Sequence, residues 1–277
     1  MRIRIRTSKT AILARRIGSL AIPLVVLPVA LHHLGLVDSP SFFTVSVLAL
    51  ITASLALLVS MLALVRLWFS GDQGWGKALS GLFLGLLCLA PFVYYGTLAW
   101  RYPPVTDIAT VPRGELPLLF LPDTAKMPPP ILLSPEEQAR IFPNATTRTY
   151  PLDALSLFGI VQRLAENEGW DLKLLQPPTA DGTQGRINAR ISTLPGWREE
   201  AVFRVSQTST GSRVDMRSAS INAPHDFGSN GTRIERFMVA LDNEVTTLLR
   251  DNPTVNQPVT QEDEEPAPAV EGDSAGE

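Results

Sequence analysis

The chain has 277 residues, of which 45% are hydrophobic, and a formal net charge of −3. The acidity belongs to the last 17 residues, which hold seven acids and no base; outside them, 24 basic side chains face 20 acidic ones. This balance argues against nucleic-acid binding, and the single cysteine, Cys88, excludes an intrachain disulfide. The length leaves room for a membrane block and one soluble domain.

Three apolar segments in the first hundred residues are each long enough to cross a bilayer, at residues 17–37, 42–65 and 78–100. An α-helix rises about 1.5 Å per residue, so about twenty apolar residues span roughly 30 Å of hydrocarbon. Aromatic residues typical of the membrane–water interface lie at or near the segment ends: Trp68, Trp75, Tyr94, Tyr95, Trp100 and Tyr102. We therefore expect a three-helix transmembrane block, residues 17–100, in contact with the lipid bilayer.

Basic residues flank these segments unevenly. Residues 1–16 carry six Lys or Arg side chains and the second loop carries Arg66 and Lys77, whereas the first loop, 38–41, has no base. Positive charge marks cytoplasmic loops, so the N-terminus is expected in the cytoplasm. Three spans then carry the rest of the chain across, which predicts a multi-pass protein of the bacterial inner membrane with a periplasmic C-terminal domain.

Two further interpretations concern this block. A cleaved signal peptide is an alternative for the first segment, but its long apolar run and the two spans that follow favour a retained anchor. Gly81 and Gly85 have the four-residue spacing that lets two helices approach closely. Homo-oligomerisation through the transmembrane helices is therefore a hypothesis.

Residues 101–150 are rich in proline, with Pro103, Pro104 and the run 128–130 as examples. Proline fixes φ and removes a backbone donor, so an extended arm is expected. Within it, Ser134 starts a pattern of helix cap, proline and acids that predicts one short helix ending before Pro143.

A folded unit follows the arm. Apolar residues at helical spacing predict an amphipathic helix from Leu152 to about Glu168 and another that begins near Ser229 or Asn230. Between them, polar and apolar residues alternate as in an antiparallel sheet with one buried and one solvent-facing side. The four alternating segments are Trp170–Leu174, Arg186–Ile191, Ala201–Val205 and Arg213–Arg217, with a hairpin loop at Gln207–Gly211.

The predicted fold class is α+β, with three N-terminal transmembrane helices followed by a two-layer domain. Its order is α-β-β-β-β-α, an antiparallel sheet with both helices on one face. Charge and composition divide the chain into five parts: a basic cytoplasmic N-terminus (1–16), the transmembrane block (17–100), the Pro-rich arm (101–150), the soluble domain (151–250) and a disordered acidic tail (251–277).

Three motifs occur in order along the chain: YPPVTDIAT at 102–110, GSRVDMRS at 211–218 and DFGSNGTRI at 226–234. Together they resemble the bacterial and plastid family called domain of unknown function 1499, in its membrane-anchored form, over about residues 101–250. The resemblance implies no catalytic mechanism. It implies that the family's characteristic positions are Asp107, Arg213, Asp215, Arg217, Asp226, Gly228, Asn230, Arg233 and Ile234.

The stretch from Asp226 to Ile234 leads into the final predicted helix and has two interpretations. Free amides at the helix start, with Arg233 nearby, are suited to an anion. Alternatively, Asp226 and Asn230 satisfy turn and cap hydrogen bonds, Gly228 supplies an unusual φ and Arg233 pairs locally. The structural interpretation is favoured because caps and turns select these residue types in any case.

The polar side of the predicted sheet is rich in arginine, whose fork suits carboxylates and phosphates. Ligand binding is one interpretation, and a solvated face with weak cross-strand ion pairs is the other. The candidate ligand-binding residues of this face and of the turn are Arg186, Arg190, Arg204, Arg213, Asp215, Arg217, Asp226, Asn230 and Arg233.

The sequence indicates no catalytic residues, metal site or cofactor. His32 and His33 are adjacent and diverge on a helix, and His225 has no neighbouring His or Cys. The leading hypothesis is a non-enzymatic binding or assembly module for an envelope protein, an anionic lipid or a polysaccharide. The alternatives are an envelope hydrolase using Asp226, His225 or Asp215, and an accessory subunit of a membrane complex.

Overall fold

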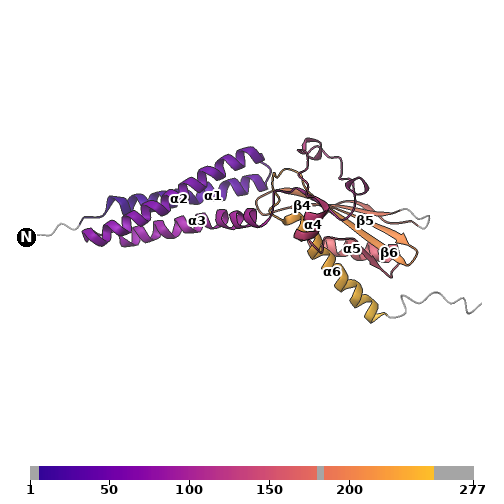
Figure 1. The fold of residues 1–277 in the computed structure, drawn as a ribbon. Coiled ribbons are helices and arrows are strands. Elements are labelled where there is room, and N and C mark those ends of the chain that lie inside the picture. The colour runs from indigo at the N-terminus through magenta and orange to yellow at the C-terminus, as the bar shows by residue number, and fades with distance from the viewer. Residues whose placement is uncertain (1–5, 180–183, 253–277) are drawn as a thin grey trace, which may run out of the picture.

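The computed structural model describes residues 6–179 and 184–252. The first five residues of the predicted basic N-terminus lie outside this part, as does the predicted acidic tail from residue 253 onward. A bundle of three helices is followed by a domain built on a sheet, and the two are joined end to end (Figure 1).

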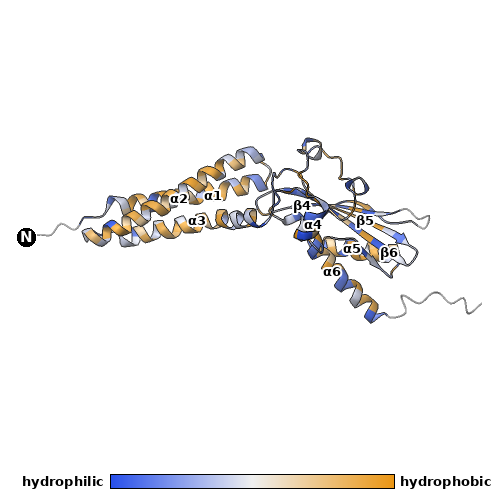
Figure 2. Cartoon of the chain, in the orientation of Figure 1, coloured by the Kyte–Doolittle hydropathy of each residue, from blue (hydrophilic) through white to orange (hydrophobic). Residues whose placement is uncertain are grey.

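The bundle consists of α1 (Lys9–His33), α2 (Ser39–Ser70) and α3 (Trp75–Arg101). All three helices are long and apolar enough to cross a membrane, and Figure 2 shows that hydrophobic residues dominate them along most of their length. α2 and α3 extend past both ends of the predicted apolar segments, because a helix continues past its apolar part until a cap stops it. α1 begins eight residues before its predicted segment and ends at His33, four residues before that segment does. At the end of α2, Gly71 (φ 67°) provides such a cap.

The small residues of α3 are used within this one bundle. A Cβ on Gly81 would lie 2.7 Å from the backbone of Ala14 in α1 and 2.8 Å from the Ser60 hydroxyl in α2. A Cβ on Gly85 would lie 3.1 Å from the Leu57 nitrogen. The glycine pair therefore serves close packing inside the chain, and homo-oligomerisation through the transmembrane helices stays a prediction.

The domain contains a six-stranded antiparallel sheet in the order β1-β6-β5-β4-β3, with β2 also paired to β6. The strands are β1 (Asp107–Ala109), β2 (Arg148–Tyr150), β3 (Asp171–Gln176), β4 (Gly185–Ser192), β5 (Arg198–Thr208) and β6 (Gly211–Ser220). All four predicted strands and the hairpin between β5 and β6 are present. β1 and β2 were not predicted, and both come from the segment expected to be an extended arm.

Two helices, α5 (Ala154–Asn167) and α6 (Ser229–Asp251), cover one face of the sheet (Figure 1). Their apolar stripes meet the inward side chains of the strands in one core, whose fully buried members include Leu157, Ile187, Phe203, Met216 and Leu241. The predicted short helix is α4 (Pro135–Ile141), and it begins with a capping box between Ser134 and Glu137. The α+β fold is confirmed.

One predicted side-chain direction is wrong. The alternation placed Trp170, Leu172 and Leu174 on one side, but an irregularity between Leu172 and Leu174 changes the register. Leu172 stays opposite Ala189 on the core face, while Leu174 lies opposite Asn188 on the polar face. A β-bulge of this kind shifts every later side chain of a strand by one position, which alternation alone does not reveal.

Candidate functional site

The polar face of the sheet is covered. A segment of the Pro-rich arm that contains two 3₁₀ turns, η1 (Arg113–Glu115) and η2 (Thr124–Lys126), crosses the side opposite α5 and α6. The predicted solvent-facing side is therefore wrong, although the arginines do share one face. Alternation identifies residues on one side of a sheet and carries no information about a distant segment that packs over it.

Arg217 in β6 is fixed to the start of the arm. Its Nη2 lies 2.7 Å from Asp107 Oδ2 and its Nε lies 3.1 Å from Oδ1, which is a bidentate ion pair. The Arg217 Nη1 also donates to the Leu116 carbonyl at 2.8 Å. Asp107 is fully buried and Arg217 is 8% exposed, so this pair holds β1 and the arm against the sheet.

A second cluster surrounds Asp215, which is fully buried. Arg204 donates to Asp215 Oδ2 from Nη2 at 2.6 Å and from Nε at 3.0 Å, and Arg213 lies 3.3 Å away. The Thr147 hydroxyl donates to the other oxygen at 2.6 Å. Burial opposes the charge on Arg204, but the hydrogen bonds that Arg204 donates to Asp215 and then to Glu115 outweigh burial and raise the pKa of Arg204.

The remaining arginines of the face also contact the arm or its neighbours. Arg190 pairs with Glu200 at 3.2 Å and with Asp123 of the arm at 3.2 Å. Arg186 donates to the Pro117 carbonyl, and burial lowers the pKa of Arg186. Each predicted arginine of this face thus has a partner within the chain, and a ligand would have to displace the arm to reach it.

The turn before α6 has the structural role that the sequence favoured. Asp226 accepts hydrogen bonds from the amides of Gly228 at 2.8 Å and Asn230 at 3.1 Å. Phe227 (φ 53°) and Gly228 (φ 80°) both adopt the left-handed conformation. Because Asp226 itself takes two amides at the helix start, it occupies the position that an anion would need.

The rest of that turn forms a buried polar network. Asn230 is fully buried, and its side chain contacts the hydroxyls of Ser218 at 2.8 Å and Ser220 at 3.0 Å. Arg233 donates to Ser218 at 2.8 Å and pairs with Glu199 at the start of β5. These contacts attach the first turn of α6 to the central strands, and they leave neither side chain exposed to a ligand.

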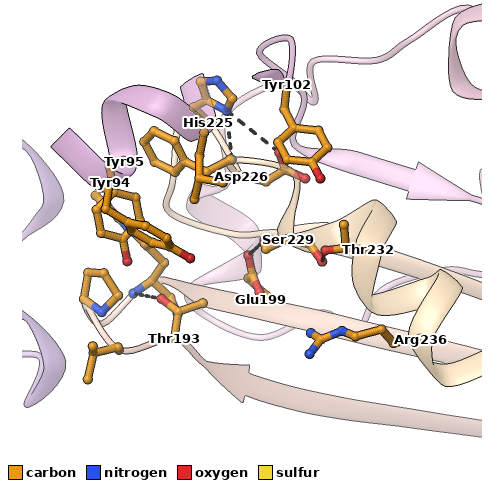
Figure 3. A pocket seen from close by; sticks show the side chains of 15 residues that line it. Tyr94, Tyr95, Tyr102, Thr193, Glu199, His225, Asp226, Ser229, Thr232 and Arg236 are labelled. Atoms are coloured by element: carbon orange, nitrogen blue, oxygen red, sulfur yellow. Dashed lines mark hydrogen bonds and ion pairs between the residues drawn. The ribbon is translucent and has the colours of Figure 1, made fainter. Parts of the chain in front are cut away.

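A pocket of about 330 Å³ lies where the domain meets the helical bundle (Figure 3); we call it the junction pocket. Its wall comes from the last turns of α3, the loop 193–197 between β4 and β5, and the start of α6. Its polar side chains come from parts of the chain that are far apart in sequence: Tyr94, Tyr95, Tyr102, Thr193, Glu199, His225, Asp226, Ser229, Thr232 and Arg236.

The contact between the bundle and the domain positions this pocket. Trp197, 5% exposed, packs edge-on against Phe42 of α2 with ring centroids 5.4 Å apart and against His32 of α1 at 4.7 Å. His32 Nδ1 lies 2.5 Å from the Pro195 carbonyl. On the other side, Phe227 packs on Tyr95 of α3 at 5.1 Å. Aromatic contacts therefore fix the loop and the turn to the helix ends.

The acidic side chains around the junction pocket have hydrogen-bond or ion-pair partners, whereas one basic side chain has none among the described residues. Glu199 is paired with Arg233 and accepts from the Ser229 hydroxyl at 2.6 Å. The Asp226 carboxylate accepts hydrogen bonds from two amides of the helix start. Arg236 is exposed and, among the described residues, has no hydrogen bond or ion pair. Among the residues that the structure describes, the pocket thus has one cation without a partner, and both of its carboxylates have hydrogen-bond partners within the chain.

Residues 125–241 match the model of a family described as Protein of unknown function (DUF1499). The soluble domain is a DUF1499 domain. The match includes the motifs at 211–218 and 226–234, whereas the motif at 102–110 and the helical bundle precede it. No curated protein matches the chain. The chain therefore joins a DUF1499 domain to three helices able to cross a membrane.

The DUF1499 motifs lie next to the junction pocket without forming most of it. Of the predicted site residues, Asp226 lines the pocket, and Arg233 acts behind it through Glu199. Arg236 and loop 193–197 were missed. The only signal of this pocket in the sequence was the group of interfacial tyrosines, Tyr94, Tyr95 and Tyr102. They indicated a membrane boundary but did not identify the residues that face them across the pocket.

Proposed function

We propose that this protein is a membrane-anchored, non-enzymatic binding module that holds an anionic component of the cell envelope in the junction pocket. The observation that carries the proposal is Arg236, an unpaired cation beside a hollow at the point where the DUF1499 domain meets the helix ends. A pocket with a few convergent polar groups is the usual form of a ligand site.

The charges of the pocket favour an anion. Glu199 is paired with Arg233 and the Asp226 carboxylate is hydrogen-bonded by two helix amides, so both repel an incoming anion less than free carboxylates would. The hydroxyls of Tyr94 and Tyr102 add hydrogen-bond donors to the lining, whereas the Thr232 hydroxyl already donates to the Gly228 carbonyl at 2.7 Å. The arginine-bearing face contributes indirectly in this proposal, because its ion pairs fasten the arm that completes the domain.

We place the DUF1499 domain on the periplasmic side of a bacterial inner membrane. The start of α1 and the loop between α2 and α3 lie at the same end of the bundle, where Thr7 pairs with Gln73. Basic residues gather at this end, remote from the domain: Arg6, Lys9, Arg15, Arg16, Arg66 and Lys77. The positive-inside rule assigns that end to the cytoplasm and the domain to the opposite side.

The hydrolase alternative has one observation in its favour, since His225 and Asp226 line the same pocket. His225 Nδ1, however, accepts the Phe227 amide at 2.9 Å, and Asp226 is committed to capping α6. Asp215, the third candidate, lies under the arm in a separate cluster. The predicted acid–base groups are therefore not gathered around one reacting position, and binding is the better-supported function.

Photo-crosslinking in native membranes tests the proposal. Tyr94 is replaced with p-benzoylphenylalanine, which keeps an aromatic ring at the pocket wall, and adducts are identified by mass spectrometry. We expect a crosslink to an anionic envelope component, and we expect this adduct to be lost in the chain that also carries Arg236→Glu. The matched control is Arg250→Glu, an equally large charge change at an exposed site of α6 away from the pocket. An adduct that does not depend on Arg236 would refute the proposal.

The orientation has its own test. A reporter enzyme that is active only in the periplasm is fused after Asn252, at the end of the described C-terminal helix. We expect activity from this fusion and none from the same reporter inserted at Gln73, in the loop between α2 and α3. The reverse pattern would place the domain in the cytoplasm.

A further inference from the structure

An apolar groove of about 220 Å³ lies in the bundle directly below loop 193–197. Ser46, Val47 and Leu50 of α2 form one wall and Phe92 of α3 forms the other, with Trp197 closing the top. Leu50 is twelve residues beyond the N-cap Asp38, which corresponds to about 18 Å along the helix. The groove therefore reaches about half-way through a hydrocarbon core of roughly 30 Å.

The groove and the junction pocket adjoin each other. Four residues line both of them: Tyr95, Pro195, Trp197 and Phe227. The environment changes sharply across these residues, because the groove presents almost only apolar side chains whereas the pocket presents hydroxyls, His225 and Arg236. An apolar groove at membrane depth that lies next to a polar pocket at the surface has the polarity of an amphiphile.

We propose that the groove and the junction pocket together hold one membrane lipid with an anionic headgroup. This inference rests on the proposed function and names its ligand class. One acyl chain lies between α2 and α3, and the headgroup lies in the pocket, where Arg236 donates to its phosphate. The lipid enters sideways from the leaflet next to the DUF1499 domain, because the groove residues Val47 and Leu50 are exposed on the lipid-facing surface of α2.

Charge complementarity selects the headgroup. Arg236 is the cation of the pocket that has no partner among the described residues, and the two carboxylates of the lining are satisfied within the chain. A zwitterionic lipid would bring its own cation to Arg236, whereas an anionic headgroup brings only negative charge. The groove supplies affinity through apolar burial and the pocket supplies selectivity through charge.

Native mass spectrometry of the full chain in detergent tests this inference, with dioleoyl phosphatidylglycerol and dioleoyl phosphatidylcholine as the two probes. We expect one bound phosphatidylglycerol, held about tenfold more tightly than phosphatidylcholine, as expected for one charge-assisted contact. Arg236→Glu should remove the preference. Ser46→Phe should fill the groove and weaken the binding of both lipids.

Each variant has a matched control. Thr44→Phe places the same ring on the same helix at an exposed residue outside the groove, and Arg250→Glu repeats the charge change outside the pocket. Both controls should bind lipid as the unaltered chain does. Thermal unfolding of every variant identifies any that does not fold, and Ser46→Leu then provides a smaller filling of the groove.

The outcomes separate this inference from the proposed function. Equal binding of the two lipids, or no effect of Ser46→Phe and Ser46→Leu, would overturn the lipid assignment, as would a dimer in place of a lipid complex. If the Arg236-dependent adduct at Tyr94 persists in Ser46→Phe, the binding module stands and its ligand has no acyl chain in the groove. If neither the adduct nor lipid binding depends on Arg236, both the proposed function and the lipid inference are refuted.

Discussion

Single residues show how local space decides the effect of a substitution. Gly159 lies on the exposed side of α5, and a Cβ there would meet nothing within 4 Å, whereas a Cβ on Gly231 in α6 would collide with the ring of Phe142. Phe142 is 1% exposed and stacks on Tyr102, so its ring has no room to move. Glycine is therefore not needed for packing at position 159 but is required for packing at position 231.

We expect Gly159→Ala to stabilise the domain by about 0.5–1 kcal/mol, because alanine is the better helix former. Gly231→Ala should destabilise it by about 1–3 kcal/mol through overpacking, despite the same gain in propensity. Urea denaturation of the solubilised chain, followed by the fluorescence of the half-buried Trp170, measures both. Equal effects of the two substitutions would contradict the packing argument.

Tyr150 gives the domain a dependence on alkaline pH. Burial, assisted by a 2.6 Å hydrogen bond to Asp242, raises the pKa of Tyr150 far above its ordinary value of 10. In the unfolded chain the phenol ionises near its ordinary pKa, whereas in the folded chain it stays protonated. This contribution to stability is therefore complete below about pH 10 and decreases as the pH rises further.

Tyr150→Phe should remove this part of the pH dependence. At neutral pH the variant loses the hydrogen bond to Asp242, a loss of about 0.5–1.5 kcal/mol. From about pH 9 to about pH 11 its unfolding midpoint should fall less than that of the unaltered chain, since no phenol at this position ionises on unfolding. Urea midpoints across this range provide the measurement, and parallel curves would contradict the assignment.

At the scale of an element, the arm is the part whose role the sequence did not predict. Its composition correctly indicated an irregular chain with one short helix, because proline and the capping pattern act locally. Its position over the sheet depends on ion pairs between residues about a hundred positions apart, such as Asp107 and Arg217. Alternation predicted which arginines share a face, and only the folded chain identifies their partners.

Asp107→Asn should release the arm from the sheet. The substitution leaves Arg217 and Arg113 beside a neutral side chain in a buried position, and breaking a buried pair in this way typically destabilises by about 3–5 kcal/mol. Glu244→Gln, which removes the exposed pair with Arg163, should change stability by less than about 1 kcal/mol. Denaturation curves test the difference, and hydrogen exchange should locate the new exposure at β1 and residues 113–126.

An arm that stays protected in Asp107→Asn would show that its other contacts suffice. Those contacts are substantial, since Arg204 reaches Glu115 and Glu200 accepts the Leu119 amide at 2.8 Å. The experiment therefore measures how far the arm behaves as one cooperative element.

At the scale of the whole molecule, the sequence predicted the two parts and the order of their elements but not the contact between them. Hydropathy identifies a membrane helix and alternation identifies a strand because each is a repeating pattern within one segment. The junction pocket has no such pattern. It depends on Trp197, Phe227 and Tyr95, which lie far apart in the chain and meet only when the sheet domain packs on the helix ends.

Trp197 is the residue through which bundle and domain are most directly coupled, because its ring packs on α1 and α2 while its backbone belongs to loop 193–197. Trp197→Ala should leave the thermal midpoint of the domain nearly unchanged, since its side chain belongs to a separate cluster from the main core. Trp170→Ala, which removes a ring stacked on Phe203 and Phe237, should lower that midpoint strongly. In Trp197→Ala, hydrogen exchange in loop 193–197 should become faster and the retention of phosphatidylglycerol should become weaker. The two changes should appear together because the same ring closes the groove and joins the bundle to the domain. A loosened loop with unchanged lipid retention would show that these two roles are separate.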